Sequence, residues 1–136
     1  MMNREILFRG KRVDNGEWVY GDLTVESCGT VIHFCENGRR TETIVISKTV
    51  GQYTGLKDKS GKKIFEGDII ADFDTDNRYV VEWEKETACF ILNNADERKA
   101  DSFSGVEILD CWDIYNGTFE LDVIGNIHDN SELLKG

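Results

Sequence analysis

The chain has 136 residues, with 26 acidic and 16 basic side chains, a net charge of −10, 13 glycines and no proline. This length suits one domain that buries its own hydrophobic core. The charge is uneven, because residues 1–71 hold 11 Lys and Arg against 10 Asp and Glu, whereas residues 72–136 hold 5 against 16. An acidic second half repels a phosphate backbone, so we do not expect nucleic-acid binding unless the first half carries it.

The cysteines and the N-terminus point to a reducing compartment. None of the four cysteines lies in a CxxC pair, and residues 1–10 contain no apolar run that would suit a signal peptide or a membrane span. We therefore expect reduced thiols, no membrane association and a cytoplasmic protein. The cysteines are Cys28, Cys35, Cys89 and Cys111.

Short segments of alternating apolar and polar residues follow one another along the chain, separated by turns rich in Gly, Asn and Asp. This pattern is typical of antiparallel hairpins. Five hairpins are predicted, with their loops at residues 14–16, 36–38, 59–61, 85–87 and 116–117. The polar segment 93–104 has no apolar stripe and is predicted to be an exposed loop, while residues 130–134 are predicted to form a short helical turn. The fold class is therefore all-β, or mainly β.

Three segments carry a family resemblance. They read GQYTGLKDKSGKKIFEGDII at residues 51–70, VVEW at 80–83 and VIGNIHDNSELL at 123–134, and they follow FRG and EWVYGDL in the first 23 residues. In this order they resemble the YopX family of phage and prophage proteins over nearly the whole chain. The family pattern has a proline before Glu-Leu-Leu, where this chain has Ser131.

This resemblance implies a phage or prophage origin, a mostly β structure and a location in the cytoplasm of the host bacterial cell. It implies no known activity, so it supplies neither catalytic residues nor a cofactor. Residues 64–128 also look like a small SH3-like barrel. We therefore predict an N-terminal β-hairpin subdomain at residues 1–55 and an SH3-like β-barrel subdomain at residues 56–136, which ends in the short helical turn.

Two aspartates follow glycines at the start of predicted strands. Asp68 follows Gly67, and Asp22 follows Gly21. An aspartate in this position commonly accepts hydrogen bonds from backbone N–H groups and fixes the turn. We predict that Gly67 and Asp68 shape the turn that enters a barrel strand, and that neither aspartate is catalytic.

Two patterns match metal sites incompletely. Asp72, Asp74 and Asp76 resemble the opening of a calcium loop, but the later ligand positions of such a loop are missing. His33 and Cys35 share one face of a predicted strand, yet no CxxC pair completes a zinc site. The sequence therefore predicts no metal, no cofactor and no activated cysteine nucleophile.

The function predicted is that of a non-enzymatic accessory protein that binds a host or phage protein. Trp18 and Tyr53 are the expected aromatic anchors. The alternative is a nucleic-acid-directed module that binds DNA through basic turns, Lys62 and Lys63 among them, or imitates DNA with its acidic half. Unpaired sheet edges favour a homo-oligomer over a monomer.

Overall fold

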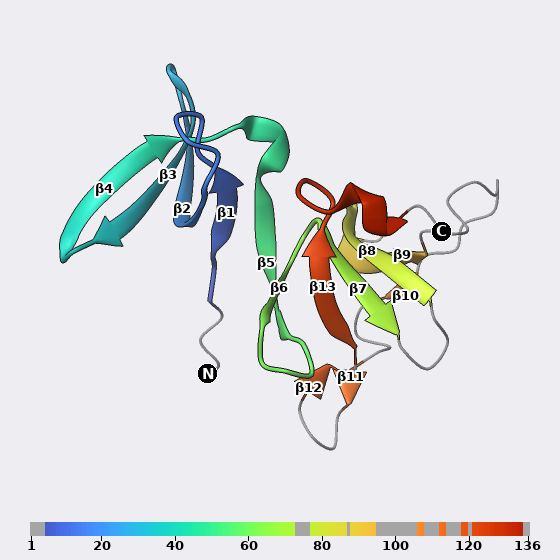
Figure 1. The fold of residues 1–136 in the computed structure, drawn as a ribbon. Helices are drawn as coiled ribbons and strands as arrows, with labels where there is room; N and C mark the ends of the chain where they lie inside the picture. The colour runs from blue at the N-terminus through green and yellow to red at the C-terminus, as the bar shows by residue number, and fades with distance from the viewer. Residues whose placement is uncertain are drawn as a thin grey trace. The chain divides into compact units, whose positions relative to one another are not determined.

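The structure is a computed structural model that describes residues 5–72, 77–86, 88–94, 106–107, 112–113, 118–119 and 121–134. Strands dominate these residues, and none of them lies in an α-helix (Figure 1). The helical segments in this described part are single 3₁₀ turns, at Ser47–Thr49 and Ser131–Leu134. The prediction of a mainly β protein built from antiparallel strands is confirmed.

The chain divides into two compact units, Met1–Gly55 and Leu56–Gly136. The first unit is built on consecutive antiparallel strands in the spatial order β4-β3-β2-β1-β5. Its strands are β1 (Phe8–Lys11), β2 (Trp18–Glu26), β3 (Gly29–Glu36), β4 (Arg39–Ile44) and β5 (Gly51–Lys57). The last residues of β5 belong to the second unit, and β6 (Lys63–Phe65) lies beside β5 in the sheet.

The turn between β3 and β4 shows why the Asn-Gly pairs are informative. Asn37 and Gly38 both have positive φ, of 53° and 78°, and Glu36 pairs with Arg39. Two central residues with positive φ form the type I′ turn that matches the twist of a hairpin. The β2–β3 connection, by contrast, carries no Asn-Gly pair and was not among the predicted hairpins, although Glu26 pairs there with Gly29.

The core of the first unit is small. Val19, Ile32 and Val45 are buried and touch one another, and Leu23, Phe34 and Val50 pack against them. Along β2, the residues between these apolar positions face the other side of the sheet, because side chains alternate along a strand. One face of this sheet therefore covers the core, while the other carries mostly polar side chains.

The second unit contains an antiparallel sheet in the order β10-β9-β8-β7-β13. Its strands are β7 (Asp68–Asp72), β8 (Asn77–Glu84), β9 (Cys89–Asn94), β10 (Val106–Glu107) and β13 (Asp122–Asn126), and a separate pair is formed by β11 (Trp112–Asp113) and β12 (Thr118–Phe119). Ile64, Ile70, Val81, Phe90 and Leu92 form its buried core. Among the described residues β10 and β13 remain the two edges of the sheet, so the predicted closed barrel is not confirmed.

The fifth predicted hairpin is confirmed only at its inner end, where Trp112 pairs with Phe119 and Asp113 with Thr118. Its predicted outer strands have other partners among the described residues, because β10 pairs with β9 and β13 pairs with β7. An alternating pattern indicates that a segment is a strand, but it does not specify the partner strand. Gly67 lies in the turn before β7 with a φ of 92°, and β7 begins at Asp68.

Candidate functional site

The polar face of the first unit's sheet holds the main group of candidate functional side chains. Opposite residues of antiparallel strands share a face. Lys11 lies opposite Trp18, Arg9 opposite Tyr20, and Asp22 opposite His33. The register therefore brings aromatic, basic, acidic and imidazole groups from three strands onto one surface.

The Trp18 ring contacts two cationic side chains, those of Arg9 and Lys11. The guanidinium carbon of Arg9 lies 4.7 Å from the centre of the Trp18 ring, and the ammonium nitrogen of Lys11 lies 5.5 Å from it. A cation at this distance from an indole face is attracted by the ring's π-electrons. The Trp18 ring is partly buried, and Arg9 is only 5% exposed. Trp18 is therefore held in a fixed position at the surface.

A hollow of about 550 Å³ opens next to this ring. It is lined by Arg12 and Glu17 of the first turn, residues 18–22 of β2, residues 33–36 of β3, and Arg40 of β4. Tyr20 is 47% exposed at its wall. The hollow thus combines exposed aromatic surface with charged groups of both signs.

Arg12 and Asp14 form a paired group at the turn beside this hollow. The Arg12 Nε donates to Asp14 Oδ1 at 2.9 Å, and Arg12 Nη2 donates to Asp14 Oδ2 at 2.8 Å. This hydrogen-bonded pairing lowers the pKa of Asp14 and raises the pKa of Arg12. The Arg12 guanidinium is therefore hydrogen-bonded to Asp14, and this pair holds the turn in one orientation.

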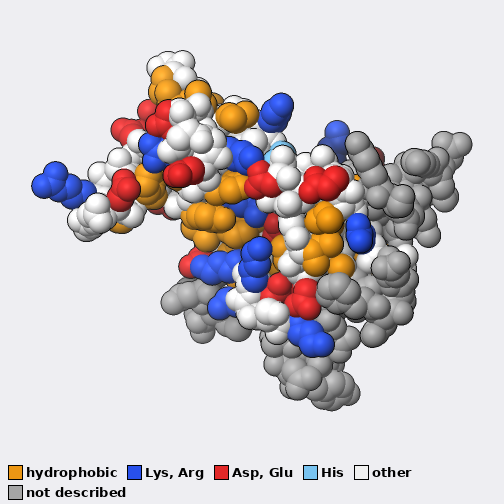
Figure 2. Space-filling model, in the orientation of Figure 1, with side chains coloured by type: hydrophobic (Ala, Val, Ile, Leu, Met, Phe, Trp, Pro, Cys, Tyr) orange, Lys and Arg blue, Asp and Glu red, His pale blue; other side chains and the backbone are white. Residues whose placement is uncertain are grey.

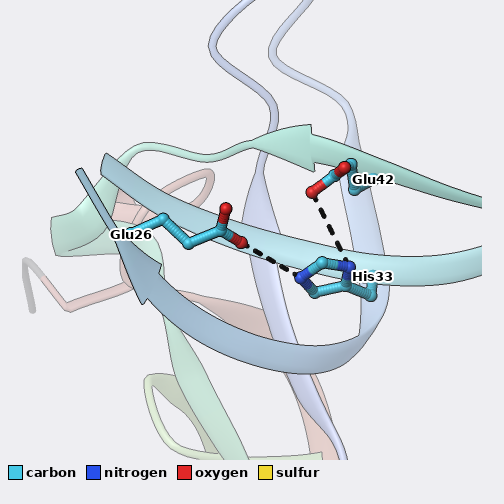
Figure 3. Close-up of side chains that lie close together, drawn as sticks. All are labelled: Glu26, His33 and Glu42. Carbon is cyan, nitrogen blue, oxygen red and sulfur yellow. Dashed lines mark ion pairs between the residues drawn. The ribbon is translucent and has the colours of Figure 1, made fainter. Parts of the chain in front are cut away.

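His33 lies between two carboxylates on the same face (Figure 3). Its Nε2 is 3.3 Å from Glu26 Oε2, and its Nδ1 is 3.7 Å from Glu42 Oε2. Glu26 ends β2, His33 is in the middle of β3, and Glu42 comes from β4. Three neighbouring strands thus supply one imidazole and two carboxylates, which we call the His33 cluster.

Two buried carboxylates in the second unit serve the backbone. Asp68 is 1% exposed, and its Oδ2 accepts the Phe65 N–H at 2.7 Å. Asp58 is 2% exposed; its Oδ1 accepts the N–H groups of Ser60 and Lys62, and its Oδ2 accepts the N–H of Val123. Asp68 is the first residue of β7 and accepts its hydrogen bond across the preceding turn. The sequence reasoning missed Asp58, which follows no glycine and lies 65 residues from Val123.

The two predicted aromatic anchors, Trp18 and Tyr53, differ in their exposure to solvent. Trp18 borders the hollow, whereas Tyr53 is only 6% exposed. The prediction that Tyr53 is an exposed anchor is therefore wrong, because alternation along β5 places Tyr53 on a buried side between the partly exposed residues Gln52 and Thr54. Trp83 in the second unit is 49% exposed, and its ring packs edge-on against Phe90.

The other predicted positions are scattered. Lys62 is exposed and Lys63 is partly buried at the β5–β6 turn. Figure 2 shows basic and acidic side chains interspersed over the described part of the face that it draws, with apolar surface between them. Asp74 and Asp76 of the calcium-like pattern lie outside the described residues. Cys35 is exposed, and the acidic residues that approach His33 are Glu26 and Glu42.

No helix in the described part of the chain has the length and apolar character that a membrane crossing requires.

Comparison with known proteins identifies the family. The model of the YopX protein family matches residues 7–135. The chain belongs to the YopX family. Its fold is similar to that of protein EF1440 from Enterococcus faecalis, with a TM-score of 0.55 and 21% sequence identity over 97% of this chain and 99% of that chain. At this level of identity the likeness shows the fold alone. A comparison with curated proteins found no match.

Proposed function

We propose that this YopX-family chain is a phage or prophage accessory protein that binds a host or phage protein in the host cytoplasm and catalyses no reaction. The observation that carries the proposal is the open hollow on the first unit's sheet, with Trp18 fixed at its border and Tyr20 exposed at its wall. Tryptophan, tyrosine and arginine are the residues that most often dominate the binding energy of protein interfaces.

The arrangement of Trp18 supports this role. Its ring is held by Arg9 and Lys11, so little side-chain entropy remains to be lost when a partner binds. The mixed charges around it, from Arg12, Glu17 and Arg40, suit a polar rim around an aromatic contact. Such a surface would bind a complementary protein mainly through contact with the rings.

Affinity capture from infected host cells tests the proposal, using the full chain as bait and Trp18→Ala as the test variant. Trp83→Ala is the matched control, because it removes an exposed tryptophan from the other unit. We expect a host or phage protein to be retained by the wild type and by Trp83→Ala and lost with Trp18→Ala, while circular dichroism shows that all three baits are folded. Retention should change little with salt, because screening weakens charge pairs and leaves aromatic contacts intact.

Two outcomes would contradict the proposal. Equal capture of the same protein by wild type and Trp18→Ala would show that the hollow is not the binding surface. Direct binding of duplex DNA that weakens steeply with salt and is abolished by charge reversal at Lys62 and Lys63 would instead establish a nucleic-acid-directed module.

A further inference from the structure

The His33 cluster concentrates negative charge around a single nitrogen donor. Besides Glu26 and Glu42, Asp22 lies directly opposite His33 across the β2–β3 pair and shares its face. On the other side of β3, the residue opposite His33 is Glu42 itself. His33 is thus flanked by carboxylate-bearing residues on both neighbouring strands, a setting that favours a bound cation.

Thr24 positions one of the two carboxylates. Its hydroxyl donates to Glu26 Oε2 at 2.7 Å and lies 2.9 Å from His33 Nε2. The same Oε2 atom lies 3.3 Å from Nε2. The Glu26 carboxylate is therefore held beside the imidazole nitrogen.

The distances are close to those of a metal site. One ligand atom from each of Glu26, His33 and Glu42 lies within 4.8 Å of the others. Bonds of about 2.1 Å in a tetrahedron place two ligand atoms about 3.4 Å apart. The distance from His33 Nε2 to Glu26 Oε2, at 3.3 Å, already has this value. The Glu42 side chain is exposed to solvent, so a small rotation can bring its carboxylate to the same ion.

We propose that Glu26, His33 and Glu42 form an open divalent transition-metal site on the first unit's sheet, with Zn²⁺ as the ion that suits it best. One imidazole with two carboxylates is a mixed nitrogen and oxygen donor set, which Zn²⁺ accepts and which Ca²⁺ and Mg²⁺, as oxygen-seeking ions, do not favour. Three protein ligands leave at least one coordination position for water or for a group from a partner. The site adjoins the hollow, because His33 also lines it, but the proposal of a metal site does not rest on the hollow's proposed role in protein binding.

The sequence patterns give no indication of this site. The three ligands are at positions 26, 33 and 42, with no repeated short spacing, and only the β2–β3–β4 register places them together. The exposed Cys35, two residues from His33, is the ligand that the sequence suggests instead. The experiment must therefore distinguish a carboxylate site from a thiolate site.

Isothermal titration calorimetry with ZnCl₂ on the full chain, under reducing conditions, tests the proposal. The test variants are Glu42→Gln and His33→Gln, which preserve size and remove a ligand. The controls are Glu17→Gln, an exposed carboxylate of the same unit outside the cluster, and Cys35→Ser. Titration with CoCl₂, followed by its visible absorption, reports the ligand type, because thiolate coordination adds an intense charge-transfer band that oxygen and nitrogen ligands do not give.

We expect saturable binding of a single Zn²⁺ to the wild type, unchanged affinity in Glu17→Gln and Cys35→Ser, and affinity weaker by at least about tenfold in Glu42→Gln and His33→Gln. Zn²⁺ should also raise the melting temperature of the wild type and leave that of His33→Gln unchanged, because an ion that binds only the folded state stabilises it. The Co²⁺ complex should lack a thiolate band.

Three results would each overturn the metal site. They are no saturable Zn²⁺ binding to the wild type, binding that persists at full affinity in both Glu42→Gln and His33→Gln, and binding that is lost only with Cys35→Ser. Because Trp18→Ala capture and Zn²⁺ titration use different variants and readouts, failure of one proposal does not imply failure of the other.

Discussion

The two sheets differ in how many of their faces are covered. In the second unit, the adjacent residues Ile69 and Ile70 on β7 and Val80 and Val81 on β8 are all fully buried, so both faces of these central strands are covered. In the first unit, β2 alternates between buried Val19 and exposed Tyr20, so one face stays open. The side chains that can bind something lie on that open face, whereas the buried carboxylates of the second unit hold its backbone.

The comparison shows that charge alone does not mark function. The buried Asp58 and Asp68 satisfy backbone N–H groups and are inaccessible to a ligand. The exposed Glu26 and Glu42 have a ring nitrogen as their neighbour and remain accessible. An acidic side chain acquires a structural or a binding role according to the group that it faces.

The largest effect is expected from Asp58→Ala in the second unit. Removing this carboxylate leaves three backbone N–H groups, of Ser60, Lys62 and Val123, without their acceptor. We expect a loss of about 3 kcal/mol in the free energy of unfolding, measured by urea denaturation, because unsatisfied buried donors and lost charged hydrogen bonds are each costly.

Asp122→Ala is the matched control for Asp58→Ala. Its carboxylate accepts one exposed hydrogen bond, from the Ser60 hydroxyl at 3.1 Å, so the loss should stay below about 0.5 kcal/mol. Equal losses in the two variants would break the distinction between a buried structural carboxylate and an exposed one.

An intermediate effect is expected from Gly21→Ala in the first unit. A Cβ at position 21 would lie 2.0 Å from the backbone oxygen of His33, so β2 and β3 must move apart. We expect a loss of about 2 kcal/mol in the free energy of unfolding, in the range that overpacking costs. Gly38→Ala, in the β3–β4 turn, meets no atom within 4 Å and has only its positive φ to oppose it, so about 1 kcal/mol is expected there. A smaller loss for Gly21→Ala than for Gly38→Ala would show that the β2–β3 contact is not tight.

The smallest effect is expected from Asp14→Asn, and it should depend on pH. The pKa of Asp14 is lowered in the folded protein by its hydrogen bonds with Arg12. A carboxylate with a lowered folded pKa contributes stability that is fully present above its unfolded pKa and is lost as the pH falls through the folded pKa. The melting temperature of wild type should therefore slightly exceed that of Asp14→Asn at pH 7, and the difference should vanish at acidic pH. A difference that grows on acidification would contradict this account.

Local signals in the sequence predict the strands well. The Asn37–Gly38 pair predicts a hairpin because only a few residue types adopt positive φ at low cost, and the chain forms the expected type I′ turn. Alternation also separates buried Val19 from exposed Tyr20 on β2. Local signals fail for β13, because nothing in residues 122–126 indicates that their partner is β7, about fifty residues earlier.

The candidate site is less predictable because its parts come together only through register. Trp18 can be named as an aromatic of interest, but the cations above it come from β1. His33 attracts attention next to Cys35, yet its carboxylate neighbours come from β2 and β4. Tyr53 was expected to be exposed, and its burial depends on its position in β5. Sequence patterns report the periodicity within one strand, and the site depends on which strands are adjacent.

The bond between Asp58 and the Val123 N–H has a consequence for the order of events during synthesis. The four strands β1 to β4 pair with one another within the first 45 residues, so this meander can form as soon as that stretch has left the ribosome, before β5 adds to β1. The second unit forms later, because β7 and Asp58 acquire β13 and Val123 only after residues 122–126 have been synthesised. Until then the β7 edge stands open, and contacts between such distant segments form slowly. A nascent chain that stalls before residue 122 therefore exposes an unpaired strand edge, so the interval between synthesis of β7 and synthesis of β13 is the one in which this protein is most prone to misassembly.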